Sequence, residues 1–393
     1  MKEKKSRLIF IDMARSIAIL LMLEGHFIDL TLGAQYRSPD PHFVNPDFLV
    51  YDIWHLIRGY TSPMFLTMTG LVITYLFYSN NSKSYWGNTR IKKGYKRILE
   101  LLFWGYLLNP SSFHILQCIG FGIFGLLVLY GLYKLTRVIP LWLYYMAASF
   151  FIFSLFAPLQ EHIIDGERVP FPLGWPNFIQ NMILAPFHRS MFPLAPNLGY
   201  TFFGAAIGVI LHSKWITISK WNIPAFLFSL GILFIFFSTD IINFAHNAIQ
   251  ETTGGSLIYL LKSNWLLETL GWVLIILGIL ATFEKLVTIK ENLFIRVGQN
   301  TLSIFILHMM LLYGAVIRVG VSTFFSKSKN PLNPYEAGIG AALFITLFIL
   351  MIYYIEPLTN WFKKVLDIVI PIRKRINKKK ITKKIEVTKK NEN

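Results

Sequence analysis

The chain has 393 residues, of which 54% are hydrophobic, 16% are aromatic and only 15% are charged. Soluble domains usually carry about 25% charged residues, so this composition excludes an ordinary soluble protein and indicates a membrane protein with several spans. The formal net charge is +17, and the single cysteine, Cys118, excludes an intrachain disulfide.

Apolar runs of about 20 residues predict an all-α fold with about ten transmembrane helices. The first run is long and carries charges in place of a small-residue cleavage site, so we expect no cleavable signal peptide. The runs make up a transmembrane domain over residues 1–362, followed by a basic tail over residues 363–393. They begin near Leu8, Ser62, Arg97, His114, Pro140, Phe192, Trp221, Trp265, Gln299 and Glu336.

The basic residues are divided unequally between alternate loops. If the N-terminus is cytoplasmic, the cytoplasmic segments hold 29 of the 38 Lys and Arg. This is the positive-inside pattern, and it predicts that both termini are cytoplasmic. The pattern accounts for the net charge without nucleic acid, and it places the basic tail beside anionic membrane lipids. We expect the bacterial inner (cytoplasmic) membrane as the location.

The first predicted span, "IDMARSIAILLMLEGHFIDL" over residues 11–30, contains several charged or titratable side chains. Arg15 and His26 are eleven positions apart, which places them only about 20° apart around a helix and roughly 16 Å apart along it. Asp12 falls on the same face, whereas Glu24 points away. Asp29 is the residue that we expect to hold the His26 ring by a hydrogen bond.

Charged groups at bilayer depth cost several kcal/mol each and usually mark function. The alternative interpretation is structural: Asp12 and Arg15 would form a buried pair that fixes helix packing, and His26 would bind a neighbouring carbonyl. Spacing alone leaves both interpretations open.

Several motifs carry a resemblance to a known family. Arg-x10-His in the first span resembles the signature of integral-membrane acyltransferases of the acyltransferase-three type. The phrase "IDMARSIAILLMLEGHF" resembles the opening of the heparan-alpha-glucosaminide N-acetyltransferase-like branch. Four later stretches resemble that branch in the same order, so that the landmarks cover about residues 8–320: "SPMFLTMTGLVI", "HILQCIGFG", "FPLAPNLGYTFFGAAIG" and "GQNTLSIFILHMMLL".

The resemblance implies that residues 1–362 form an acyltransferase domain. It would move an acyl group, expected to be acetyl, from cytoplasmic acyl-CoA to an amine or hydroxyl of a glycan or glycolipid at the outer face. Arg15, Asp12 and Gln117 would contact the acyl-CoA, which is a co-substrate and not a bound cofactor. His26 would act as general base, because a neutral imidazole suits that role near neutral pH.

Part of this branch has Asn at the position of His26 and its catalytic His in the following outer loop. That loop offers His42 and His55 here, and His55 is the second candidate for the base. Asp52, Arg58 and His188 lie in outer segments and would bind a polar sugar, unless they are ordinary interfacial anchors.

Other polar groups have two interpretations each. His308 would assist at the thioester or form a hydrogen bond across helices, and Gln117 would bind the pantetheine amides or join helices. The basic run "TRIKKGYKR" would contact CoA phosphates, or it would reflect the positive-inside pattern alone. No metal-binding motif is present, so we expect no metal.

A multi-span transporter or flippase of a sugar or lipid-linked sugar is the alternative function class. Transporters of this kind commonly show two related halves with interrupted helices in corresponding positions. The sequence shows no such pairing, so the acyltransferase is the favoured prediction. The sequence leaves open whether the protein forms a homo-oligomer.

Overall fold

A computed structural model describes residues 8–39, 45–79, 83–110, 113–160, 163–164, 167–168, 192–212, 219, 221–253, 264–287 and 292–369, with side chains placed through Ser154 in the sixth helix and through Tyr354 in the last. The chain divides into two units, Met1–Ile345 and Thr346–Asn393, and the features discussed below belong to the first.

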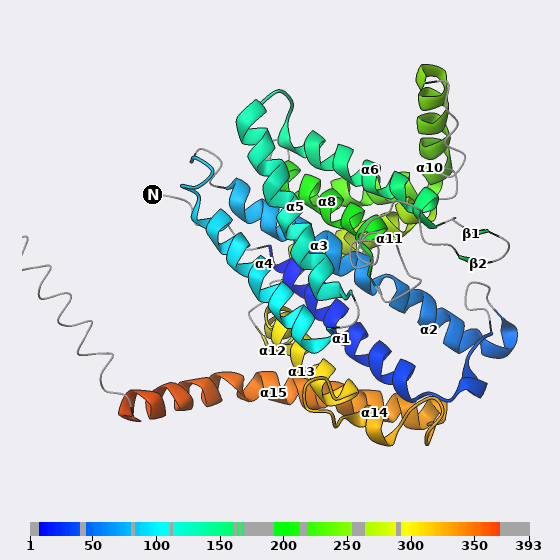
Figure 1. Cartoon of the computed structure of the whole chain (residues 1–393), viewed down its shortest axis with the longest axis vertical. Coiled ribbons are helices and arrows are strands. Elements are labelled where there is room, and N and C mark those ends of the chain that lie inside the picture. The colour runs from blue at the N-terminus through cyan, green and yellow to red at the C-terminus, as the bar shows by residue number, and fades with distance from the viewer. Residues whose placement is uncertain are drawn as a thin grey trace, which may run out of the picture. The chain divides into compact units, whose positions relative to one another are not determined.

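The described chain is almost entirely helical (Figure 1). Its first half contains α1 (Ile9–Thr31), η1 (Ala34–Tyr36), η2 (Pro46–Phe48), α2 (Leu49–Gly59), α3 (Thr61–Tyr78), α4 (Thr89–Leu108), α5 (Ile115–Thr136) and α6 (Leu141–Gln160). A two-residue antiparallel pair, β1 (Ile163–Ile164) and β2 (Glu167–Arg168), follows. The second half contains α8 (Leu194–Ile210), α10 (Asn222–Thr253), α11 (Asn264–Leu286), α12 (Leu293–Gln299), α13 (Thr301–Tyr313), α14 (Val321–Phe324) and α15 (Pro334–Val369).

A helix covers most of each predicted apolar segment, and the chain is an integral membrane protein. Four of the described helices are long and apolar enough to cross a bilayer, and the bent pair α12–α13 makes up to five. The lengths and compositions of the described helices therefore support four or five spans. They do not confirm the prediction of about ten spans with both termini cytoplasmic. The third predicted segment also starts earlier than expected, at Thr89, because Asn88 caps the helix by accepting the N–H of Arg90.

Helices α3 and α8 cross at backbone contact, beside α5 and α6 (Figure 1). Glycines make this possible: a Cβ on Gly204 would meet the carbonyl of Thr67, and a Cβ on Gly70 would meet the carbonyl of Thr201. Gly208 continues the same face of α8 one turn later, against α3. Small residues four apart are the usual means by which membrane helices approach closely, since packing and not hydrophobic burial drives their association.

Helix α1 is largely buried and packs against α3, α11, α12 and α13. Ser16 joins it to α12, because the Ser16 Oγ donates to the carbonyl of Phe294 (2.6 Å) and accepts the N–H of Gly298 (2.9 Å). Gly298 has no room for a side chain, since a Cβ would meet the α1 backbone at Asp12. The position after Arg15 thus carries a hydroxyl that holds two helices together.

The ninth predicted span, which begins near Gln299, starts at a sharp bend between two helices. Helices α12 and α13 are bent by 80° across a break at Asn300. Asn300 ends α12 by donating its backbone N–H (3.2 Å) and its side-chain amide (2.8 Å) to the carbonyl of Arg296. With α12 tied to Ser16 on one side, the chain turns at Asn300 and starts α13 in a new direction.

The segment between the first two predicted spans is not simply a loop, because it contains α2. One face of α2 is apolar and exposed: Leu49, Val50, Ile53, Leu56 and Ile57. The opposite face contacts α1, so α2 is amphipathic and has the pattern of a helix that lies at a membrane surface.

Candidate functional site

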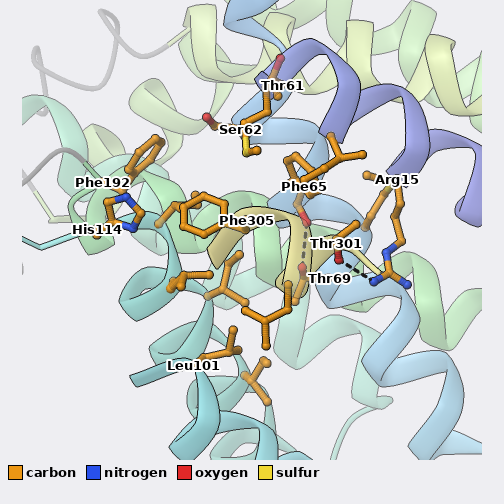
Figure 2. A pocket seen from close by; sticks show the side chains of 18 of the residues that line it. Arg15, Thr61, Ser62, Phe65, Thr69, Leu101, His114, Phe192, Thr301 and Phe305 are labelled. Atoms are coloured by element: carbon orange, nitrogen blue, oxygen red, sulfur yellow. Dashed lines mark hydrogen bonds between the residues drawn. The ribbon is translucent and has the colours of Figure 1, made fainter. Parts of the chain in front are cut away.

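A cavity of about 240 Å³ lies among α1, α3, α4, α5 and α13 (Figure 2). Most of its lining is apolar, and Phe65 and Phe305 project into its middle. The polar side chains in the lining are Arg15, His26, Thr61, Ser62, Thr69, Arg97, His114 and Thr301. An apolar cavity with a few convergent polar groups is the usual form of a small-molecule site.

Arg15 lies on one side of this cavity beside Thr301, opposite His114 and Phe192 (Figure 2). The Arg15 Nη2 donates to the Thr301 Oγ1 (3.0 Å), and Nη1 lies 3.8 Å from the Asp12 Oδ1. Asp12 itself is buried and lies outside the cavity lining, so it positions the guanidinium and does not face the cavity. Its predicted contact with acyl-CoA stays a prediction.

Arg97 contributes a second guanidinium from α4. It stands eleven residues before the end of α4 at Leu108, which places it roughly 16 Å from the turn that leads to His114. Its Nη1 pairs with Glu100 (3.0 Å), and both side chains are about two-fifths exposed (37% and 43%). His114 does not belong to α4 but is the N-cap residue of α5.

His26 has a partner that the sequence did not suggest. Its Nδ1 lies 2.9 Å from the hydroxyl of Tyr313 on α13. The expected partner, Asp29, instead pairs with Arg58 and, at 3.4 Å, with Arg37. Each oxygen of the Asp29 carboxylate thus pairs with one guanidinium group, and the expectation that Asp29 holds the His26 ring was wrong.

Two further imidazoles surround Phe305 near His26. The ring of His308 lies 5.3 Å from that of His26 and 4.7 Å from Phe305, and the ring of His114 lies 5.1 Å from Phe305. His308 is completely buried and His114 nearly so, at 5% exposed. Within the described residues, both ring nitrogens of His308 and the Nδ1 of His114 lack a hydrogen bond of normal geometry. The bond across helices expected of His308 is absent there.

Gln117 lies close to the cavity but outside its lining. It is fully buried, it packs against Gly105 of α4, and its Oε1 accepts the backbone N–H of His114 (2.8 Å). Gln117 therefore fixes the start of α5, and with it the position of His114. A direct contact of Gln117 with the donor stays a prediction.

The other predicted residues are not part of this cavity's lining. His55 stacks on Tyr51 within α2 (6.0 Å between rings), and Asp52 is buried with its Oδ2 accepting the N–H of Asn45 (2.8 Å). Arg58 pairs with Asp29 and lies against Gly25 of α1. His42 and His188 fall outside the described residues.

Sequence reasoning missed two residues of the site, His114 and Tyr313. Arg97 was included only as the last residue of the basic run "TRIKKGYKR", and His114 only as the start of a span and part of a motif. Nothing in the local sequence marks Tyr313, because its contact with His26 joins residues 287 positions apart.

Comparison with known proteins identifies the family. The family model described as "Heparan-alpha-glucosaminide N-acetyltransferase, catalytic" matches residues 7–241, which covers α1 to α8 and therefore Arg15, His26, Arg97 and His114. No curated protein matches the chain. Helix α13 lies beyond the matched residues and completes the cavity from outside them. Since the match spans more than half of the 393 residues, the chain belongs to the family of heparan-alpha-glucosaminide N-acetyltransferase catalytic domains.

Proposed function

We propose that this membrane protein transfers an acyl group, expected to be acetyl, from cytoplasmic acyl-CoA to an amine or hydroxyl of a glycan or glycolipid at the outer face of the membrane. The family is one of membrane acetyltransferases, which favours a transferase over the transporter considered as the alternative. The identities of the donor and the acceptor, and the side of the membrane on which each binds, go beyond the family assignment.

The observation that carries the proposal is the distribution of polar groups in one apolar cavity. Arg15 on α1 and Arg97 on α4 place guanidinium groups in its lining, and His26 on α1 and His114 at the start of α5 place imidazoles there. Arg15 and His26 are separated by roughly 16 Å along α1. Acyl-CoA has a matching form, because its anionic phosphates and its thioester lie at opposite ends of an extended arm. Guanidinium groups bind phosphate well.

His26 would carry out the proton transfer. Tyr313 holds the His26 Nδ1, which leaves Nε2 for the acceptor. As the acceptor oxygen or nitrogen attacks the thioester carbonyl, His26 takes the acceptor's proton. The carbon–sulfur bond then breaks, and the departing CoA thiolate receives that proton from His26. The products are the acylated acceptor and free CoA, so no metal or redox partner is needed.

His308 and His114 would stabilise the charge that develops in this step. Buried groups that can donate a hydrogen bond and have no partner among the described residues are suited to receive a negative oxygen, and the thioester carbonyl becomes one during attack. Their positions around Phe305, next to His26, would bring them close to that oxygen.

The test is transfer of label from acetyl-CoA carrying a radioactive acetyl group. Purified protein, returned to envelope membranes from a strain that lacks it, should move label into a glycan or glycolipid fraction and release one CoA thiol per acetyl transferred. The same membranes without added protein are the control. If folded parent protein neither transfers label nor releases thiol above that control, the proposed function is wrong.

A further inference from the structure

Helix α4 begins with a dense group of cations. Arg90, Lys93 and Arg97 are spaced by three and four residues, so they share one face, which we call the α4 cationic stripe. Arg90 and Lys93 are exposed, and Arg97 is partly buried in the cavity wall. Lys92 and Lys96 are also exposed and lie further round the same helix: Lys92 is about 140° and Lys96 about 100° from Arg97, although Lys96 neighbours Lys93.

This arrangement does not favour the helix. Cations in the first turns oppose the helix dipole, and like charges three or four residues apart repel one another. The stripe has a neighbouring acid in Glu100, but its pair with Arg97 is largely exposed to solvent, and such pairs contribute little to stability. The charges of the stripe therefore favour the binding of an anion more than they favour the stability of the helix.

The cavity is large enough for only one end of the donor. Sites that enclose drug-sized ligands usually have volumes of about 300–1,000 Å³. At about 240 Å³, the cavity suits the narrow acyl-pantetheine arm and not a complete acyl-CoA. A nucleotide attached to an arm in this cavity must lie outside it, on a surface continuous with the lining.

We propose that the α4 cationic stripe binds the phosphate groups of the donor's nucleotide. Arg97 stands where the stripe meets the cavity wall, so it would contact the phosphates nearest the pantetheine arm, while Arg90 and Lys93 bind those further out. Arginine offers a planar fork to phosphate oxygens and lysine a point charge. This inference rests on the proposed function and specifies where its donor is recognised.

The competing explanation is that these cations only follow the positive-inside pattern or meet lipid phosphates. That pattern depends on the side of the membrane and not on the face of a helix, so it treats Lys92 and Lys93 alike. A comparison of Arg90→Ala/Lys93→Ala with Lys92→Ala/Lys96→Ala therefore separates the two explanations. Both double variants remove two charges from the same helix and introduce a residue that favours helix.

The experiment measures binding of coenzyme A, dephospho-coenzyme A and pantetheine to the full-length protein by calorimetry in a neutral detergent without anionic lipid. Arg90→Ala/Lys93→Ala should weaken coenzyme A binding about five- to twentyfold and flatten its salt dependence, while pantetheine binding stays unchanged. Dephospho-coenzyme A, which lacks the 3′-phosphate, should show a smaller loss. Lys92→Ala/Lys96→Ala should bind all three probes as the parent does.

The inference would be overturned if the two double variants lost coenzyme A binding to the same extent. It would also be overturned if Arg90→Ala/Lys93→Ala lost pantetheine binding as much as coenzyme A binding. The first result would show general charge attraction, and the second would show damage to the cavity. If the stripe served lipid only, coenzyme A would bind both variants normally, and nanodiscs with anionic lipid would show the difference between them instead. If the parent bound no coenzyme A at all, the proposed function would fall with the inference.

Discussion

Among the described residues, the His26 ring has its hydrogen bond on one side. Its Nδ1 meets the Tyr313 hydroxyl, and the His308 ring covers part of it at 5.3 Å, while the rest of the ring lines the cavity. A base needs this combination of a fixed ring orientation and a free nitrogen. The same contacts distinguish it from His55, which stacks on Tyr51 away from the cavity lining.

Replacement of His26 should separate binding from transfer. His26→Ala should lower turnover by about 10²–10⁴-fold, the usual effect of removing a general base, and leave binding of coenzyme A close to that of the parent. Turnover is measured as thiol release and binding by calorimetry. His26→Asn should be impaired as well, since an amide cannot take a proton at neutral pH. Normal turnover in both variants, together with a loss in His55→Ala, would move the base to α2.

Replacement of Arg15 should weaken binding of the acyl donor. Arg15→Lys keeps the charge but loses the planar fork that meets Thr301, so it should bind coenzyme A several-fold more weakly and leave the melting temperature nearly unchanged. Arg15→Ala should bind more weakly still. Should Arg15→Ala bind coenzyme A as the parent does, Arg15 would be a packing residue joined to Asp12 and Thr301.

At this scale the sequence allowed a partial prediction of the site. The common face of Arg15 and His26 follows from helix geometry, and both residues do line one cavity. The partner of His26 could not be predicted, because local spacing suggested Asp29 and the contact comes from Tyr313 on a distant helix. Contacts between residues that are distant in sequence depend on how the helices pack. The residue pattern within α1 does not indicate which helix packs against it.

At the scale of elements, the crossing of α3 and α8 should be the most sensitive contact between helices. Gly204→Ala would place a methyl group against the carbonyl of Thr67 and should cost about 1–3 kcal/mol of stability, as overpacking does. The control is Gly338→Ala in α15, where a Cβ meets nothing within 4 Å. That change should be neutral or stabilise by about 0.4–1 kcal/mol.

The measurement is the melting temperature of each variant in detergent, followed by intrinsic fluorescence or by aggregation. A lower value for Gly204→Ala and an equal or higher value for Gly338→Ala is the expected pattern. If both variants melt like the parent, α3 and α8 can move apart without loss, and backbone contact is not what holds them.

Helix positions were easier to predict than helix shapes. Apolar length located α5 and α11 to within one residue of their observed starts, at Ile115 and Asn264. The ninth predicted span begins near Gln299, within two residues of the start of α13 at Thr301, but the short helix α12 before it was not predicted. Helix α2 was missed because it is too short to span a bilayer.

At the scale of the whole molecule, the distribution of basic residues predicts about ten spans with both termini cytoplasmic. Reporter fusions after Lys220 and at the C-terminus should read cytoplasmic, and a fusion near Glu167 should read external. A paired alkaline phosphatase and fluorescent-protein series provides the measurement, since the two reporters are active on opposite sides.

A C-terminal fusion that reads external would mean an odd number of spans. It would leave the cavity and its residues intact, but it would remove the argument that Arg15 faces the cytoplasm and His26 the outer side. The acyl donor would then have to be sought on the other side of the membrane.

Helix α13 contacts both polar residues of α1: Thr301 meets Arg15, seven residues later His308 meets His26, and Tyr313 also bonds to His26. Seven residues of one unbroken helix span roughly 10 Å, and a helix does not stretch. Arg15 and His26, the proposed phosphate-binding group and the proposed base, are therefore held at a fixed separation. A donor analogue with a shorter arm would bind at one end without reaching the other, so the site would select its substrate by length as well as by charge.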